Sequence, residues 1–166
     1  MVLGLSLSTF TLLHVIISHA GIGSGFVVVW GWFNNKRLDG WTAIFLVTTV
    51  LTSVTGFMFP FEGFKPSYVL AVLSLIVLAI AIYARYSRKL TGASRSTYVI
   101  TAAFALYFNC FVAVVQAFMK VPALHALAPT GSEPPFLVAQ FAVLAVFVWL
   151  TYRAVKRFRI AATATV

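Results

Sequence analysis

The chain has 166 residues, of which 61% are hydrophobic and only 9% are charged, and its formal net charge is +9. A soluble globular domain has about 25% charged residues, so this chain has too few charges to form a water-exposed surface. The composition therefore excludes an ordinary soluble domain and favours a protein that lies in a lipid bilayer. A single cysteine, Cys110, excludes an internal disulfide.

Five apolar segments are long enough to cross a bilayer core, which is about 30 Å thick and needs roughly 20 apolar residues. They cover approximately residues 10–33, 41–60, 67–86, 97–119 and 135–152, and the first begins between Leu3 and Leu12. These runs lack the two-residue alternation of barrel strands. We therefore predict a single all-α domain over residues 1–166, an integral membrane bundle of five transmembrane helices with a basic tail at 153–166.

The basic residues divide unevenly between the two ends of such a bundle. One end has two of the twelve, Lys65 and Lys120. The other end has Lys36, Arg37, Arg85, Arg88, Lys89, Arg95, Arg153, Lys156, Arg157 and Arg159. This asymmetry predicts an N-terminus outside and a C-terminus in the cytoplasm, because cytoplasmic loops of membrane proteins are enriched in Lys and Arg. The same asymmetry explains the net charge without a nucleic-acid partner.

Polar residues of the spans are expected to gather in the outer half of the bundle. We expect no buried Asp, Glu, Lys or Arg in the spans, which argues against a proton pump. The candidate pocket consists of His14, His19, Glu62, Asn109, Gln116, His125, Glu133 and Gln140. These residues would bind an apolar small molecule or a partner protein. The alternative is that they form interhelical hydrogen bonds, each worth about 0.6 kcal/mol.

The histidines raise the question of a metal or a redox cofactor. His14 and His19 are five residues apart on one predicted helix, so they project about 140° from each other and cannot both face one metal ion. We therefore predict no metal site. The alternative function is a membrane redox component that binds haem b or quinone through one of these two histidines.

Two further patterns concern packing and helix ends. Gly21 and Gly25 form a GxxxG motif, which favours close packing within the bundle and, as a second interpretation, homo-oligomerisation. Asp39 is placed to cap the second helix. In the loop at 120–134, Ser132 or Glu133 is placed to cap the last helix, and this loop would cover the candidate pocket.

Three sequence motifs carry a resemblance to known proteins. They are KRLDGWTA at 36–43, TSVTGFMFPF at 52–61 and KVPALHALAPTGSEPPFLVAQ at 120–140. Together they resemble an uncharacterised family of small bacterial multi-pass inner-membrane proteins, over about residues 11–158. The resemblance implies a bacterial inner membrane and supplies no reaction.

The chain is also distantly similar to a broader membrane family that has an early His in the first span, followed later by Arg-Leu-His. His14 matches the first feature, but Asp39 stands where the second His would be, so no role of that His transfers. The serine, histidine and acidic residues show no spacing of a catalytic triad. We therefore expect a non-enzymatic membrane protein without catalytic residues.

Overall fold

The computed structural model describes residues 2–60 and 66–159, and these ranges are helical without a β-strand. The elements are α1 (Leu7–Phe33), α2 (Asp39–Phe57), α3 (Pro66–Ile82), the π-helix η1 (Tyr83–Ser87), α4 (Ser94–Lys120), α5 (Pro122–Leu127) and α6 (Pro134–Arg157). Within the described ranges, five helices are long and apolar enough to cross a membrane, the third of them formed by α3 together with η1. The prediction of an all-α protein with five such helices is therefore confirmed.

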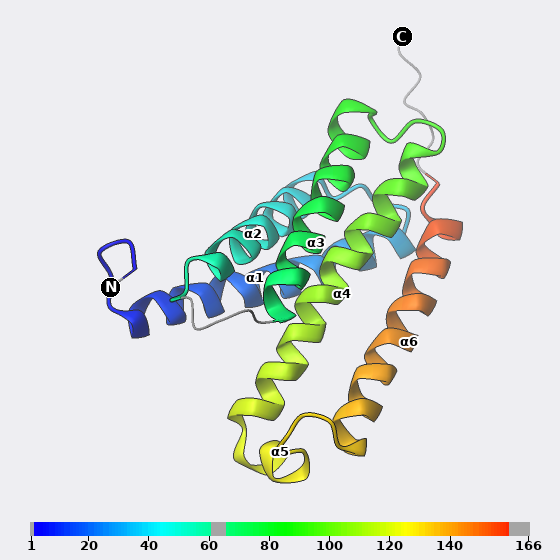
Figure 1. Ribbon diagram of the computed structural model, residues 1–166. Coiled ribbons are helices and arrows are strands. Elements are labelled where there is room, and N and C mark those ends of the chain that lie inside the picture. The colour runs from blue at the N-terminus through cyan, green and yellow to red at the C-terminus, as the bar shows by residue number, and fades with distance from the viewer. Residues whose placement is uncertain (1, 61–65, 160–166) are drawn as a thin grey trace.

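The helices pack mainly against their neighbours in the chain. In Figure 1, α3, α4 and α6 lie side by side, whereas α1 and α2 run together behind them at a steep angle. The short helix α5 joins α4 to α6 at the lower end of the picture. At the opposite end lie the α1–α2 loop, η1, the start of α4 and the end of α6, which we call the basic end.

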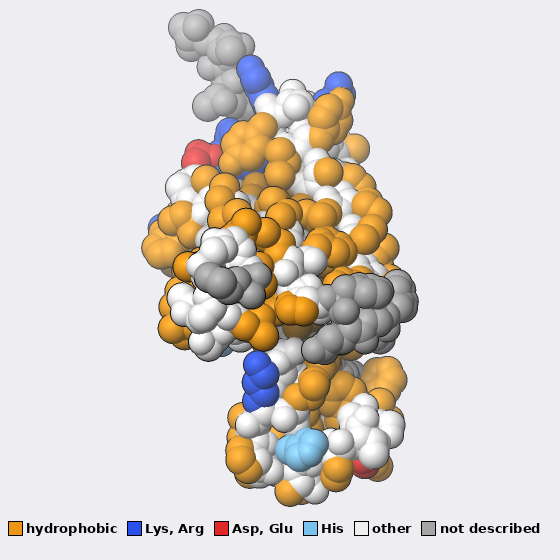
Figure 2. Space-filling view, turned by 60° about the vertical axis from the view of Figure 1, so that its left-hand side comes forward, with side chains coloured by type: hydrophobic (Ala, Val, Ile, Leu, Met, Phe, Trp, Pro, Cys, Tyr) orange, Lys and Arg blue, Asp and Glu red, His pale blue; other side chains and the backbone are white. Residues whose placement is uncertain are grey.

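The surface of the bundle is mostly apolar. Figure 2 shows hydrophobic side chains over most of the visible face, with most of the Lys and Arg side chains at the upper end. Large exposed apolar residues occur along every long helix, among them Ile16, Val47, Ile76, Phe104 and Phe141. Such a surface is suited to contact with lipid acyl chains rather than with water.

The best-packed part of the protein lies toward the basic end. Its core includes Trp32 of α1, Phe45 of α2, Leu106 of α4 and Phe158, which follows α6. Small residues let the helices approach each other there. At Gly25 an added Cβ would lie 2.5 Å from Cδ1 of Leu106, so α1 and α4 are in direct contact at this glycine. Gly21 likewise faces Thr48 and Thr49 of α2 and Asn109 of α4.

The start of α2 differs from the prediction. Leu38, with a left-handed backbone (φ 42°), is the N-cap residue, and Asp39 is the first residue of the helix. The Asp39 carboxylate makes no capping hydrogen bond and instead accepts from Arg37 and Arg85. The expectation that Asp39 caps the helix is therefore wrong. Two guanidinium groups compete for this carboxylate, and hydrogen bonds between charged groups are about twice as strong as neutral ones.

The loop that precedes α6 is ordered by Glu133. This residue is the N-cap of α6, and Pro134 and Pro135 occupy the first turn, as predicted. Its carboxylate does not bond to the helix but turns back into the loop. There it accepts from the backbone N–H and hydroxyl of Thr130 and from the backbone N–H of Ser132. These bonds, the Thr130 N–H first, lower the pKa of Glu133 from its ordinary value of 4.5 to about 2.

Candidate functional site

Three residues of the predicted outer pocket form hydrogen bonds between helices. Nδ1 of His14 in α1 lies 2.7 Å from Oγ1 of Thr55 in α2. Asn109 of α4 donates to the Thr49 hydroxyl at 3.3 Å, and Gln140 of α6 donates to the carbonyl of Phe111 in α4 at 3.2 Å. Each bond joins a different pair of helices. These three groups therefore form the interhelical hydrogen bonds that the sequence offered as the alternative to a pocket.

The remaining members of the predicted pocket lie apart. His19, Gln116 and His125 are exposed, and His19 bonds through Nδ1 to the carbonyl of Val15 in its own helix. Glu133 orders its own loop, and Glu62 lies outside the described residues. In the described part of the chain, no hydrogen bond joins two members of this set. Nor do the described residues contain a group of three or more His, Cys, Asp or Glu side chains that could hold a metal ion.

A charged residue that the sequence placed on the surface is instead fully buried at the basic end. Arg85, in the π-turn η1 at the end of α3, is 0% exposed. The prediction that the spans contain no buried charge is therefore wrong, because the third apolar span extends from Tyr68 to Ser87. Arg85 follows Leu78 and Ala81 at helical spacing, and both of these are buried. That shared face is the sequence signal that could have revealed its burial.

The guanidinium of Arg85 is held by one acidic residue, one carbonyl and two aromatic rings. Its Nη2 lies 2.5 Å from Oδ1 of Asp39 and 3.1 Å from the carbonyl of Arg37. Its Cζ lies 5.0 Å from the ring centre of Tyr98 and 5.9 Å from that of Tyr86. Such cation–π contacts stabilise a cation that is withdrawn from water. The Nε and Nη1 atoms are buried and have no hydrogen-bond partner.

The segment after α6 closes the bundle beside Arg85. The Phe158 ring is 0% exposed and packs against the rings of Trp32 and Tyr98, with ring centres 6.5 and 6.4 Å apart. Arg95 of α4 donates to the Phe158 carbonyl, and the Asn35 side chain pairs with both backbone groups of Arg159. These bonds tie the α1–α2 loop, α4 and the segment after α6 together, so the Arg85 environment is held from several sides.

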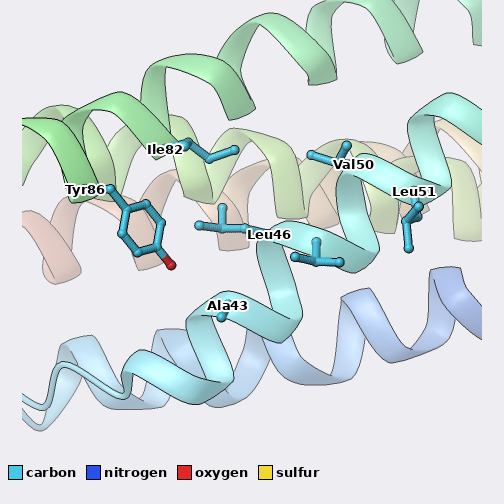
Figure 3. Close-up of a pocket in the computed structure, with 7 residues that line it drawn as sticks. Ala43, Leu46, Val50, Leu51, Ile82 and Tyr86 are labelled. Carbon is cyan, nitrogen blue, oxygen red and sulfur yellow. The ribbon is translucent and has the colours of Figure 1, made fainter.

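An apolar groove runs along the surface beside this charged centre. It has a volume of about 470 Å³ and lies between α2 and the α3–η1 helix (Figure 3). Its lining consists of Ala43, Leu46, Val47, Val50, Leu51, Ile82 and Tyr86. From Ala43 to Leu51, a rise of 1.5 Å per residue gives a length of about 12 Å. The volume is within the range of about 300–1,000 Å³ that is usual for small-molecule sites.

The chain was compared with known proteins. No family model, no curated protein and no solved structure matches it.

Proposed function

We propose that the protein is a non-enzymatic, multi-pass protein of the bacterial inner membrane that binds an apolar small molecule in the groove between α2 and α3–η1. In this proposal the N-terminus is outside and the basic end faces the cytoplasm. The distribution of basic residues supports the orientation. The binding site lies near the basic end, not in the outer half that the sequence favoured.

The groove itself is the observation that carries this proposal. All seven lining residues are apolar or aromatic, and the groove is open along the side of the bundle. A ligand dissolved in the membrane could enter it sideways without crossing water. Tyr86 supplies the hydroxyl at the end nearest the basic boundary, where amphipathic aromatic residues are preferred. The site therefore suits a molecule with a hydrocarbon chain that lies along α2.

A substitution that fills the groove tests this proposal. Ala43→Trp places a large side chain in the groove from an exposed position on α2, and Ala145→Trp makes the same change on the exposed surface of α6. The probe is radiolabelled oleyl alcohol, added to the protein in nanodiscs of neutral phosphatidylcholine. We expect saturable binding by the wild type and by Ala145→Trp, and its loss in Ala43→Trp. Equal binding by the two variants would contradict the proposal.

One observation favours the redox alternative as a second candidate. The Thr55 hydroxyl lies 2.7 Å from the carbonyl of Leu51 and 2.7 Å from Nδ1 of His14, and when its hydrogen is donated to the carbonyl its oxygen accepts the Nδ1–H of His14. In that tautomer the lone pair of His14 is on Nε2, the atom that could bind haem iron or accept a hydrogen bond from a quinol. Protein purified from membranes would then show a Soret band or contain quinone. The band or the quinone should disappear in His14→Ala and persist in His19→Ala.

A further inference from the structure

We propose that Arg85 recognises the anionic head group of an amphiphile whose hydrocarbon chain lies in the α2–α3 groove. This inference rests on the proposed function and adds the class of ligand: a single-chain molecule that ends in a carboxylate or a phosphate. The shared chemistry is an oxygen anion at one end of an apolar chain.

Arg85 is connected to one end of the groove by its contact with Tyr86. Tyr86, its neighbour in η1, lines the groove, and the guanidinium carbon is 5.9 Å from the centre of the Tyr86 ring. On the opposite wall, Ala43 lines the groove while its neighbour Thr42 is fully buried. Figure 3 shows Tyr86 and Ala43 at the same end of the groove. A chain in the groove would therefore bring its end group to the surface that covers Arg85.

The Arg85 guanidinium has hydrogen-bond donors without a partner. Only Nη2 is hydrogen-bonded, whereas Nε and Nη1 are buried without a partner. A buried donor without a partner costs about 1–3 kcal/mol, and more for a charged group, so a ligand that satisfies it is favoured. The planar guanidinium fork binds two oxygens of a carboxylate or phosphate at once. Short π-helical segments such as η1 also often occur at functional sites.

The local charge favours an anion. Asp39 is the acidic residue in contact with Arg85, and Arg37 contacts the same carboxylate oxygen at 2.9 Å. Two guanidinium groups therefore share one carboxylate, which leaves a positive excess at this point. A neutral head group gains less from such a site than a charged one.

Tyr86 controls access to the arginine. Arg85 is 0% exposed, while Tyr86 is 49% exposed. The proposal requires the Tyr86 ring, which contacts the guanidinium at 5.9 Å, to turn outward so that an anion at the groove end can reach Arg85. Exposed side chains change rotamer within nanoseconds, so this step does not require the helices to separate.

The test compares ligands that differ only in their head group. Oleate, oleoyl lysophosphatidate and oleyl alcohol are titrated against the full chain in nanodiscs of neutral phosphatidylcholine. We expect the wild type to bind one of the two anions roughly ten- to a hundredfold more tightly than the alcohol. Preference for oleate identifies a fatty acid, and preference for the lysophosphatidate identifies a phospholipid-like ligand. In Arg85→Gln the preference should be lost, while binding of the alcohol stays unchanged.

Two further variants separate recognition from folding. Arg88→Gln removes an exposed cation from the same end and should keep the preference. Asp39→Asn neutralises the carboxylate that competes for Arg85, so it should increase the affinity for the anion severalfold even though it weakens the fold. Equal affinity of the wild type for anion and alcohol, or weaker anion binding by Asp39→Asn, would overturn the inference. Loss of binding to all three ligands in the wild type would instead overturn the proposed function.

Discussion

Nη2 of Arg85 and Oδ1 of Asp39 lie 2.5 Å apart although the residues are 46 positions apart in the chain. The two ends of this ion pair are in different surroundings. The Arg85 side chain is 0% exposed, whereas that of Asp39 is 66% exposed. Losing one partner therefore has a different consequence from losing the other, because only the arginine would remain as a buried, uncompensated charge.

Substitution of Asp39 is therefore expected to destabilise the protein more than substitution of Arg85. Asp39→Ala should lower the free energy of unfolding by roughly 3 kcal/mol. Arg85→Met, which replaces the charge by an apolar chain of similar length, should cost less. Arg37→Ala serves as the control, since its ion pair with Asp39 is exposed and such pairs contribute below about 1 kcal/mol. Thermal unfolding in detergent would rank the three variants by stability. A larger loss of stability in Arg85→Met than in Asp39→Ala would refute this expectation.

Two glycines on α1 provide a matched test of helix packing. At Gly25 an added Cβ would meet Cδ1 of Leu106 at 2.5 Å and Cδ2 of Phe45 at 3.1 Å, and both neighbours are buried. Gly25→Ala should therefore destabilise the bundle by about 1–3 kcal/mol, the usual cost of overpacking. At Gly23 no atom lies within 4 Å of the added Cβ. Gly23→Ala should be neutral or stabilising by up to about 1 kcal/mol, because alanine favours the helix. Equal effects at the two positions would show that α1 and α4 do not approach here.

The loop before α6 should lose order in acid. The folded pKa of Glu133 is about 2, below its ordinary value of 4.5. The carboxylate therefore stabilises the loop above pH 4.5, and this contribution is lost as the pH falls from 4.5 through 2. The protection of the Thr130 and Ser132 amides, that is, their hydrogen-exchange rate relative to the unprotected rate at the same pH, should fall over this interval. Glu133→Gln should show low protection at both ends of the interval, and a carboxyl titration midpoint near 4.5 in the wild type would contradict the hydrogen-bonded loop.

The orientation of the bundle can be measured directly. A reporter that is active only in the cytoplasm, fused after Val166, should be active if the basic end faces inward. The same reporter fused before Met1 should be inactive. Positive residues resist translocation, and ten of the twelve lie at the basic end. Activity from the N-terminal fusion alone would show the reverse orientation.

The sequence predicted the helices well because a membrane span depends on a local property, the length of an apolar run. α4 was expected at 97–119 and is found at Ser94–Lys120. The burial of Arg85 could not be read in the same way, since it depends on Asp39, 46 residues earlier, and on Tyr98 in the next helix. For the polar residues of the spans, whether His14 faces Thr55 or a shared cavity is a question of helix rotation. That rotation is determined by packing between distant segments.

The groove was not anticipated from the sequence. Its lining residues are ordinary apolar side chains, and their residue types do not distinguish them from neighbours that face lipid. The groove arises from the angle between α2 and the α3–η1 helix. The sequence instead predicted a pocket of polar residues, and three of these, His14, Asn109 and Gln140, form separate interhelical bonds. Apolar sites of this kind carry no motif, so their position follows only from the three-dimensional arrangement.

The location of the bound ligand is the most direct test of the account. An oleyl alcohol that carries a photoreactive diazirine in its chain is bound to the protein in neutral nanodiscs, and the labelled residues are identified by mass spectrometry. We predict that labels concentrate on Ala43–Leu51 and on Ile82–Tyr86, and that Ala43→Trp removes them while Ala145→Trp does not. Labels that concentrate around His14, Gln116 and Gln140, or that spread evenly over the lipid-facing helices, would contradict the proposed site.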